Sequence, residues 1–297
     1  MTLADFAGKV YLPGRIEVSA DYAAFVLSVV RKFSTWLGRD ADLTDLTEPT
    51  ICRYLSDYRT HWSARSTNNQ RQTLLMLWSA ACDTDLLPSP PRPRRIRQLK
   101  VAADPPRAWT VEEIGRLLAT VETLDGTIAD VRASDWWMAL LLTVYWSACR
   151  IGALMKTPTD CYRRGVGVLV RAQKNKTPQW YPLPEPCCER IDRTWPTSRS
   201  VLFPWDRHPK KIFGAFRQII EAARLDCPHT GMMLFHRIRR TTISYCAAAD
   251  PAIAQRTAGH ASYQTTLRSY VDPTIAGVRS AVDVLPDPLK PQLRIHG

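Results

Sequence analysis

The chain has 297 residues, of which 45% are hydrophobic; this is enough to bury one large core or two ordinary ones and excludes wholesale disorder. Its 40 Lys and Arg outnumber 28 Asp and Glu, which gives a formal net charge of +12. Such an excess favours a polyanionic partner, most commonly nucleic acid, although a basic soluble protein without such a partner can carry the same charge.

No secretory signal, membrane span or metal site is predicted. The first 15 residues lack a basic stretch followed by an apolar one. The longest uncharged apolar run, residues 136–149, is too short to cross a bilayer and is expected to form a buried helix. The eight cysteines contain no CxxC pair, which argues against zinc ligation or a disulfide framework. We therefore expect a cytoplasmic protein with reduced thiols and no metal.

Residues 1–90 are predicted to form a small all-helical domain. Apolar residues recur at helical spacing over 21–36 and 48–62, and a third helix is expected to start at a cap formed by Ser66 or Thr67. The first turns of this third helix carry polar residues that are typical either of a solvated face or of a helix on DNA, with Arg on phosphate and amides on base edges. The DNA-binding candidates are Arg65, Asn68, Asn69, Arg71 and Gln72.

Residues 91–107 are predicted to form a basic, proline-rich linker. Prolines at 88, 90, 91 and 93 end helical structure, and residues 92–100 contain five basic residues and no acid. If the flanking domains clamp a duplex, such a segment is suited to follow the phosphates. The further DNA-binding candidates are Arg94, Arg95, Arg97 and Lys100.

Residues 108–297 are predicted to form a second domain that is mainly α with a small β-hairpin (α+β). Thr110 and Glu113 form a capping box for a helix that runs to about Val121. The buried helix ends next to Arg150, and burying an unpaired guanidinium is costly. Arg150 should therefore have an anionic partner, either an acidic side chain or a ligand.

The β-hairpin is expected over residues 166–183, with strands at 166–171 and 180–183. The turn between these strands carries two lysines, Lys174 and Lys176. Further helices are predicted at residues 209–224, 235–248, 251–258, 263–270 and 275–284.

Residues 235–270 contain a polar cluster that is set by helix geometry. His236 and Arg239 are three residues apart, so both side chains leave one helix face. Asp250 before Pro251 is typical of a helix start and Gly259 of a helix end, so His260 follows directly on a helix stop. With Tyr270 about one helix later, the pattern indicates an anion site to which a nucleophile is delivered.

Together these residues form a coherent phosphoryl-transfer site. Two arginine forks can hold the charge that gathers on a five-coordinate phosphorus. A tyrosine, with a pKa of about 10, needs a base or nearby positive charge, a histidine can be that base, and a lysine can protonate the leaving alkoxide. No Mg²⁺ or other cofactor is needed. The catalytic candidates are Arg150, Lys174, His236, Arg239, His260 and Tyr270.

This ordered set resembles the tyrosine recombinases, or phage-type integrases. The motifs are SACRIGALM around Arg150, AQKNKTPQWYPLP around Lys174, HRIRR, AGH and TTLRSY. The resemblance covers nearly the whole chain, since the family joins a helical core-binding domain through a linker to a mixed catalytic domain. It implies a site-specific recombinase whose Tyr270 attacks a phosphate of double-stranded DNA. The product would be a 3′-phosphotyrosine and a free 5′-hydroxyl, and the reverse step would need no ATP.

The resemblance also implies a role for each residue. Arg150 and Arg239 would hold the phosphate, Lys174 would be the general acid, His236 would assist proton transfer and His260 would hydrogen-bond the phosphate. It further implies a tetramer on two duplexes that self-associates through the segment after Tyr270.

The chain departs from the family pattern in two places and leaves alternatives open. Tyr270 lies ten residues after His260, where many members have nine. Ala153 stands where many members have an acidic residue, which puts orientation or stability in doubt more than the chemistry. Tyr263 and Lys176 are the rivals of Tyr270 and Lys174. The rival functions are a type IB topoisomerase-like strand transferase and a catalytically silent DNA-binding relative.

Overall fold

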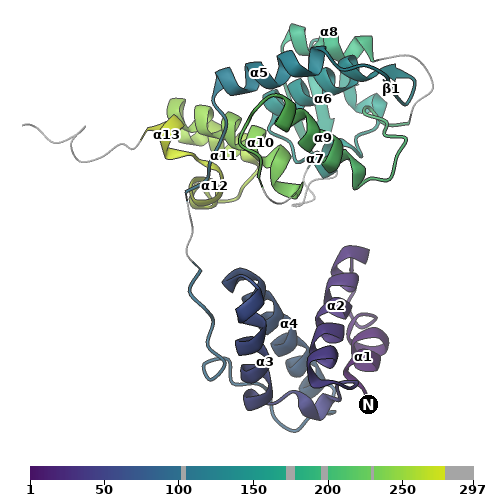
Figure 1. Cartoon of the computed structure of the whole chain (residues 1–297), viewed down its shortest axis with the longest axis vertical. Helices are drawn as coiled ribbons and strands as arrows, with labels where there is room; N and C mark the ends of the chain where they lie inside the picture. The colour runs from purple at the N-terminus through teal and green to yellow at the C-terminus, as the bar shows by residue number, and fades with distance from the viewer. Residues whose placement is uncertain (102–104, 172–177, 195–199, 229–230, 278–297) are drawn as a thin grey trace, which may run out of the picture. The chain divides into compact units, whose positions relative to one another are not determined.

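The computed structural model describes residues 1–101, 105–171, 178–194, 200–228 and 231–277 (Figure 1). The chain divides into two units, Met1–Ala103 and Asp104–Gly297, and this division falls inside the segment predicted as a linker. Both units are mainly helical with small antiparallel sheets in the second, which confirms the predicted fold class. No helix within the described ranges is long and apolar enough to cross a membrane.

Unit 1 is a helical bundle with its own hydrophobic core. Its elements are α1 (Leu3–Asp5), η1 (Phe6–Tyr11), α2 (Ala20–Leu37), η2 (Leu43–Asp45), α3 (Glu48–His61) and α4 (Ala64–Asp83). The prediction for the start of the third helix was wrong by a few residues: Ser63 caps α4, because its hydroxyl accepts a hydrogen bond from the Ser66 amide at 3.2 Å. The short N-terminal helices were not predicted, although Leu3 and Phe6 are both fully buried.

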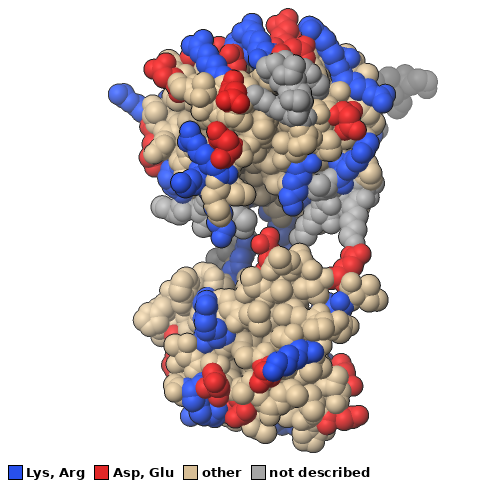
Figure 2. Space-filling model, turned by 90° about the vertical axis from the view of Figure 1, so that its right-hand side faces the viewer, with Lys and Arg blue, Asp and Glu red and all other residues tan. Residues whose placement is uncertain are grey.

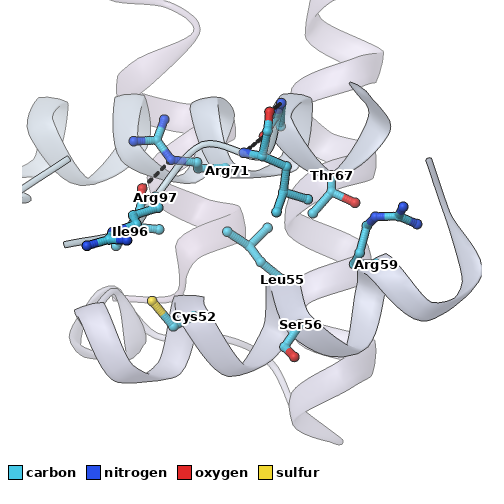
Figure 3. A pocket seen from close by; sticks show the side chains of 10 residues that line it. Cys52, Leu55, Ser56, Arg59, Thr67, Arg71, Ile96 and Arg97 are labelled. Atoms are coloured by element: carbon cyan, nitrogen blue, oxygen red, sulfur yellow. Dashed lines mark hydrogen bonds between the residues drawn. The ribbon is translucent and has the colours of Figure 1, made fainter. Parts of the chain in front are cut away.

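The basic segment after α4 is attached to unit 1 along residues 93–99 (Figure 3). Ile96 is 1% exposed in the core of this unit. Arg71 donates from Nε to the carbonyl of Ile96 at 2.5 Å and from Nη2 to that of Pro93 at 2.8 Å. Asn68 exchanges two hydrogen bonds with the backbone of Leu99, both at 2.9 Å. This part of the predicted linker is therefore fixed on the α3–α4 surface.

Unit 2 combines helices with two small antiparallel sheets, β1–β2 and β3–β4–β5. Its helices are α5 (Val111–Glu122), α6 (Ala133–Ser147), α7 (Ile151–Leu154), η3 (Thr159–Cys161), α8 (Glu185–Arg193), α9 (Lys211–Ala222), α10 (Gly231–Ala249), α11 (Pro251–Ala258), α12 (Tyr263–Tyr270) and α13 (Pro273–Ala276). Its strands are β1 (Thr127–Ile128), β2 (Val131–Arg132), β3 (Tyr162–Arg163), β4 (Gly167–Val170) and β5 (Gln179–Tyr181).

The apolar helix α6 lies in the centre of the core of unit 2. Trp137 on α6 stacks on Phe216 of α9 and on Phe235 of α10, with ring centroids 5.7 Å and 6.4 Å apart. The helix ends at Ala148, whose φ of 50° is left-handed, so the chain turns sharply before Arg150. The packing of α6 therefore fixes where this arginine leaves the core.

The predicted β-hairpin is present, with Leu169 opposite Trp180. Gly167 opens β4 at φ 127°, and a Cβ atom there would collide with the backbone of Tyr181, so only glycine fits. The turn that carries Lys174 and Lys176 lies outside the described residues.

The helices after α10 follow the caps read from the sequence. Asp250 caps α11, its carboxylate accepting from the Ala252 amide at 2.7 Å, and Gly259 ends the helix at φ 64°. The predicted helix 275–284 differs, because the structure has the short α13, which ends at Gly277. The rest of that prediction lies outside the described residues.

The anchoring of Leu99 predicts that Asn68→Ala lowers the free energy of unfolding of unit 1. The substitution removes both hydrogen bonds between the largely buried Asn68 side chain and the backbone of Leu99, each of which contributes about 0.5–1.5 kcal/mol. Urea denaturation of the full chain followed by a unit 1 signal measures the change. Asn69→Ala on the same helix removes an exposed amide and should change stability by less than about 0.5 kcal/mol; equal effects of the two substitutions would contradict the anchoring role.

Candidate active site

Five of the six catalytic candidates come together in unit 2 from three helix ends and one helix face. Arg150 precedes α7, and His236 and Arg239 lie on α10. His260 directly follows the end of α11, and Tyr270 is the last residue of α12. The sixth candidate, Lys174, lies outside the described residues.

Arg239 is the buried centre of the cluster, with 1% of its surface exposed. Its Nη1 donates to the carbonyl of Ala148, and its Nη2 donates to the carbonyl of Ala258 at 2.7 Å. These carbonyls belong to the ends of α6 and α11, where helices leave backbone oxygens without internal partners. The Arg239 Nε is buried and finds no hydrogen-bond partner among the described residues.

Arg150 is half-buried and approaches a histidine instead of an acid. Its Nη2 lies 3.4 Å from Nε2 of His260. Within the part of the chain that the structure describes, neither Arg150 nor Arg239 has a carboxylate within 4.0 Å. Two neighbouring guanidinium groups without an acidic side chain among the described residues have the charge that suits a bound anion.

His260 is held in one tautomer by its neighbours. Its Nδ1 lies 3.0 Å from the hydroxyl of Thr266, which is fully buried. Because the guanidinium of Arg150 can only donate, Nε2 of His260 accepts from it, and Nδ1–H donates to Thr266. Burial, together with Arg239 and Arg150, lowers the pKa of His260 to about 4. The sequence analysis missed Thr266, although it stands in the quoted TTLRSY motif.

His236 is also neutral at physiological pH. Burial first, and then the charges of Arg239, Arg240 and Arg150, lower its pKa to about 4. Its ring centroid lies 6.0 Å from that of Tyr270. The site therefore holds two uncharged imidazoles beside two arginines.

The ring of Tyr270 lies against this cluster. The guanidinium carbon of Arg239 is 4.9 Å from the ring centroid, and the ring of His260 is 5.1 Å away. Tyr270 lines an open hollow of about 440 Å³ together with Arg150, His260 and Thr265. The rival Tyr263 does not line this hollow, although both tyrosines pack against a small buried cluster that includes Ile243.

Ala153, where the family often has an acid, is 6% exposed in the main core of unit 2. The eight cysteines are free thiols. The described residues contain no group of three or more His, Cys, Asp and Glu side chains that could hold a metal ion.

The DNA-binding candidates of unit 1 fall into two groups. Asn68 and Arg71 use their side chains on the backbone of residues 93–99, a role within unit 1 that the sequence analysis missed. The others are exposed: Arg65, Asn69, Gln72, Arg94, Arg95, Arg97 and Lys100. Arg65, Asn69 and Gln72 have the spacing i, i+4, i+7 and so share one face of α4. Arg95 pairs with Glu48 at 3.3 Å.

On the face of unit 2 drawn in Figure 2, basic side chains are scattered among acidic ones. Within unit 2, Arg164 pairs with Asp192 at 2.6 Å and also contacts Glu185. Such surface pairs neutralise each other locally, so the net charge alone does not locate a binding face.

The sequence matches no protein family model and no curated protein. Solved structures are similar to it. The Tn1549 transposon integrase (residues 82–397), in complex with a circular intermediate DNA, is 14% identical with a TM-score of 0.69, over 91% of this chain and 95% of that chain. A lambda integrase (residues 75–356) dimer bound to a core site is 17% identical with a TM-score of 0.70, over 90% and 94%. The XerH site-specific recombinase bound to a palindromic difH substrate is 17% identical with a TM-score of 0.65, over 82% and 74%.

At these identities the likeness concerns the fold. The chain has the fold of the tyrosine recombinases and integrases, as the resemblance of its motifs implied. The alignments extend over most of the chain and so include residues of both units.

The lowered pKa values of His236 and His260 predict that the folded chain becomes less stable in mild acid. An unfolded histidine titrates near 6.5, so between that value and about 4 the unfolded chain binds more protons than the folded one. The free energy of unfolding should therefore decrease as the pH falls from 6.5 to 5. Urea denaturation across this range measures the slope.

The double variant His236→Asn/His260→Asn should flatten this pH dependence. His61→Asn, which removes an exposed histidine of unit 1, is the matched control and should leave it unchanged. An undiminished slope in the double variant would show that other groups govern the acid response.

Proposed function

We propose that the chain is a site-specific DNA recombinase that cleaves and rejoins strands through a covalent 3′-phosphotyrosyl intermediate. One observation carries the proposal. Arg150, His260 and Tyr270 line one hollow, the buried Arg239 and His236 lie against the ring of Tyr270, and the described residues place no carboxylate within 4.0 Å of either arginine. The three structures to which the chain is similar are complexes with DNA.

The arginines would hold the scissile phosphate. Guanidinium groups stay protonated and bind phosphate oxygens in a fork, so they can stabilise charge that develops on the non-bridging oxygens. His260, whose Nε2 accepts from Arg150, would hydrogen-bond the phosphate after a change of tautomer or protonation. The half-buried Arg150 and the fully buried Arg239 would approach the phosphate from different elements.

Tyr270 would be the nucleophile. Its hydroxyl oxygen forms a bond to phosphorus, the bond from phosphorus to the 5′-oxygen breaks, and the phenolic proton passes to a neighbouring base. His236 is neutral and lies beside the Tyr270 ring, so it can assist this transfer. Lys174 would protonate the departing 5′-oxygen. Attack by a 5′-hydroxyl reverses the step, so no ATP is consumed.

A bound phosphate would also raise the pKa values of both histidines. The charges of Arg239 and Arg150 contribute to lowering the pKa of both His236 and His260. An anion between these arginines would offset that contribution and raise both pKa values toward 6.5. The histidines would then become better proton acceptors when DNA is bound.

Unit 1 would contact the duplex through α4. Arg65, Asn69 and Gln72 lie exposed on one face of this helix, where arginine can bind phosphate and the amides can reach base edges. Arg94, Arg97 and Lys100 are exposed on the neighbouring basic segment and would add phosphate contacts. We also propose a tetramer on two duplexes, which brings together the strands to be exchanged.

Tyr270→Phe should form no covalent adduct with DNA while keeping its affinity for DNA. The substitution removes only the attacking oxygen. The measurement is trapping on a nicked suicide duplex that carries the recombination site, resolved under denaturing conditions. Tyr263→Phe is the matched control and should trap DNA like the wild type, whereas an adduct with Tyr270→Phe would reject the assignment of the nucleophile.

Arg65→Ala should weaken DNA binding and reduce the slope of log K against log [salt] by about 1, because one phosphate contact is lost. Fluorescence anisotropy at several salt concentrations measures both quantities. Arg39→Ala removes the same charge from unit 1, but Arg39 is paired with Asp45 at 2.6 Å and should change the slope little. Equal slopes for the Arg65→Ala variant and the wild type would contradict a phosphate contact by this face of α4.

A further inference from the structure

The chain immediately after Tyr270 is held by a buried carboxylate. Asp272 is 6% exposed and caps α13, its Oδ1 accepting from the Thr274 amide at 2.9 Å and the Thr274 hydroxyl at 2.7 Å. Its Oδ2 accepts a hydrogen bond from the Ala108 amide at 2.7 Å. A helix cap needs only the first oxygen, so the second oxygen forms a separate, long-range connection.

Helix α10 holds the same stretch of backbone from another side. The hydroxyl of Ser244, which is fully buried, donates to the carbonyl of Tyr270 at 3.3 Å. It also accepts from the amide of Asp272 at 2.8 Å. One serine therefore holds a backbone group of Tyr270 and one of the residue two positions later.

Ala108 is itself a fixed point. The next residue, Trp109, is 1% exposed, and its amide donates to the hydroxyl of Thr241 on α10 at 3.0 Å. The same hydroxyl donates to the Trp109 carbonyl at 2.7 Å. The hydrogen bond from Ala108 to Asp272 thus attaches the end of α12 to a segment that is already anchored on α10.

We propose that Asp272 is a positioning residue that sets the place of the Tyr270 hydroxyl by attaching the end of α12 to Ala108. The inference rests on the proposed function, because it assigns this role in the attack by Tyr270. Helix α12 has only eight residues, and short helices are marginally stable by themselves. Leu267, Arg268 and Ser269 in its last turn are exposed. The position of Tyr270 therefore depends on the contacts that hold the chain on either side of it.

The electrostatics agree with this role. Burial tends to raise the pKa of Asp272, but hydrogen bonds from Thr274 and from the Ala108 amide, with the charge of Arg107, outweigh it and lower the pKa. The carboxylate is therefore ionised at neutral pH and can accept all three of its hydrogen bonds. Both oxygens are occupied by these donors.

Asp272→Ala should slow the attack without weakening DNA binding. Misplacing a reacting group by about 1 Å can cost about a hundredfold in rate, so we expect a 10- to 100-fold slower single-turnover adduct formation on a suicide duplex. DNA affinity should stay within about twofold, because Arg150 and Arg239 are untouched. Asp272→Asn keeps one acceptor oxygen and should restore part of the rate.

The chain offers a matched control in Asp250. It also caps a helix in front of a proline, but its carboxylate accepts from the nearby Ala252 amide and forms no long-range hydrogen bond in the described structure. Asp250→Ala should therefore slow adduct formation by less than about threefold. Equal slowing in both aspartate variants, or a wild-type rate in Asp272→Ala, would overturn the proposal.

A second variant tests the proposal if Asp272→Ala folds poorly, and a second measurement tests it if no DNA cleavage is observed. Ser244→Ala removes the other connection and should slow the attack similarly at unchanged DNA affinity. Amide hydrogen exchange of the free protein should show faster exchange at Ala108 and Val271 in Asp272→Ala than in Asp250→Ala. If the wild type forms no adduct, the proposed function fails, and unchanged exchange at these two amides would separately overturn the attachment of α12.

Discussion

The burial of Arg239 is the interaction on which the site depends. From one helix, α10, this side chain binds the terminal carbonyls of two others, α6 at Ala148 and α11 at Ala258. The carbonyl end of a helix carries partial negative charge, so it is a favourable partner for a guanidinium. Because Arg150 and His260 follow these two helix ends within two residues, the same contacts set their positions relative to His236. One buried cation therefore assembles the proposed anion site.

Two residues with a left-handed backbone conformation make this arrangement possible. Gly259 ends α11 at φ 64°, which costs glycine little, and His260 follows at once. Ala148 ends α6 at φ 50°, where an alanine pays a strain of about 1–2 kcal/mol. The bond to Arg239 and the burial of Ala148 hold this conformation in place. The turn before Arg150 is thus maintained by the cluster that it helps to build.

Local signals in the sequence predicted the parts of the site that depend on neighbouring residues. Asp250, Pro251 and Gly259 mark the ends of α11, so the place of His260 after a helix stop could be read directly. Asn68 and Arg71 could not be distinguished from their exposed neighbours, because their backbone partners lie 22 to 31 residues away. The bond between Ala108 and Asp272 spans 164 residues and leaves no local pattern at all. Sequence periodicity places side chains on faces, whereas only the tertiary fold decides which backbone those faces meet.

The charge distribution couples the stability of unit 2 to its proposed ligand. Folding brings Arg150 and Arg239 together with no carboxylate within 4.0 Å among the described residues, and the burial of such charge opposes folding. Burial, together with these charges, also disfavours protonation of His236 and His260, so both histidines are neutral. An anion that binds only the folded cluster stabilises the folded state by mass action. The uncompensated charge of Arg150 and Arg239 lowers the stability of the folded unit. The same charge would favour the binding of a phosphate over that of a neutral ligand.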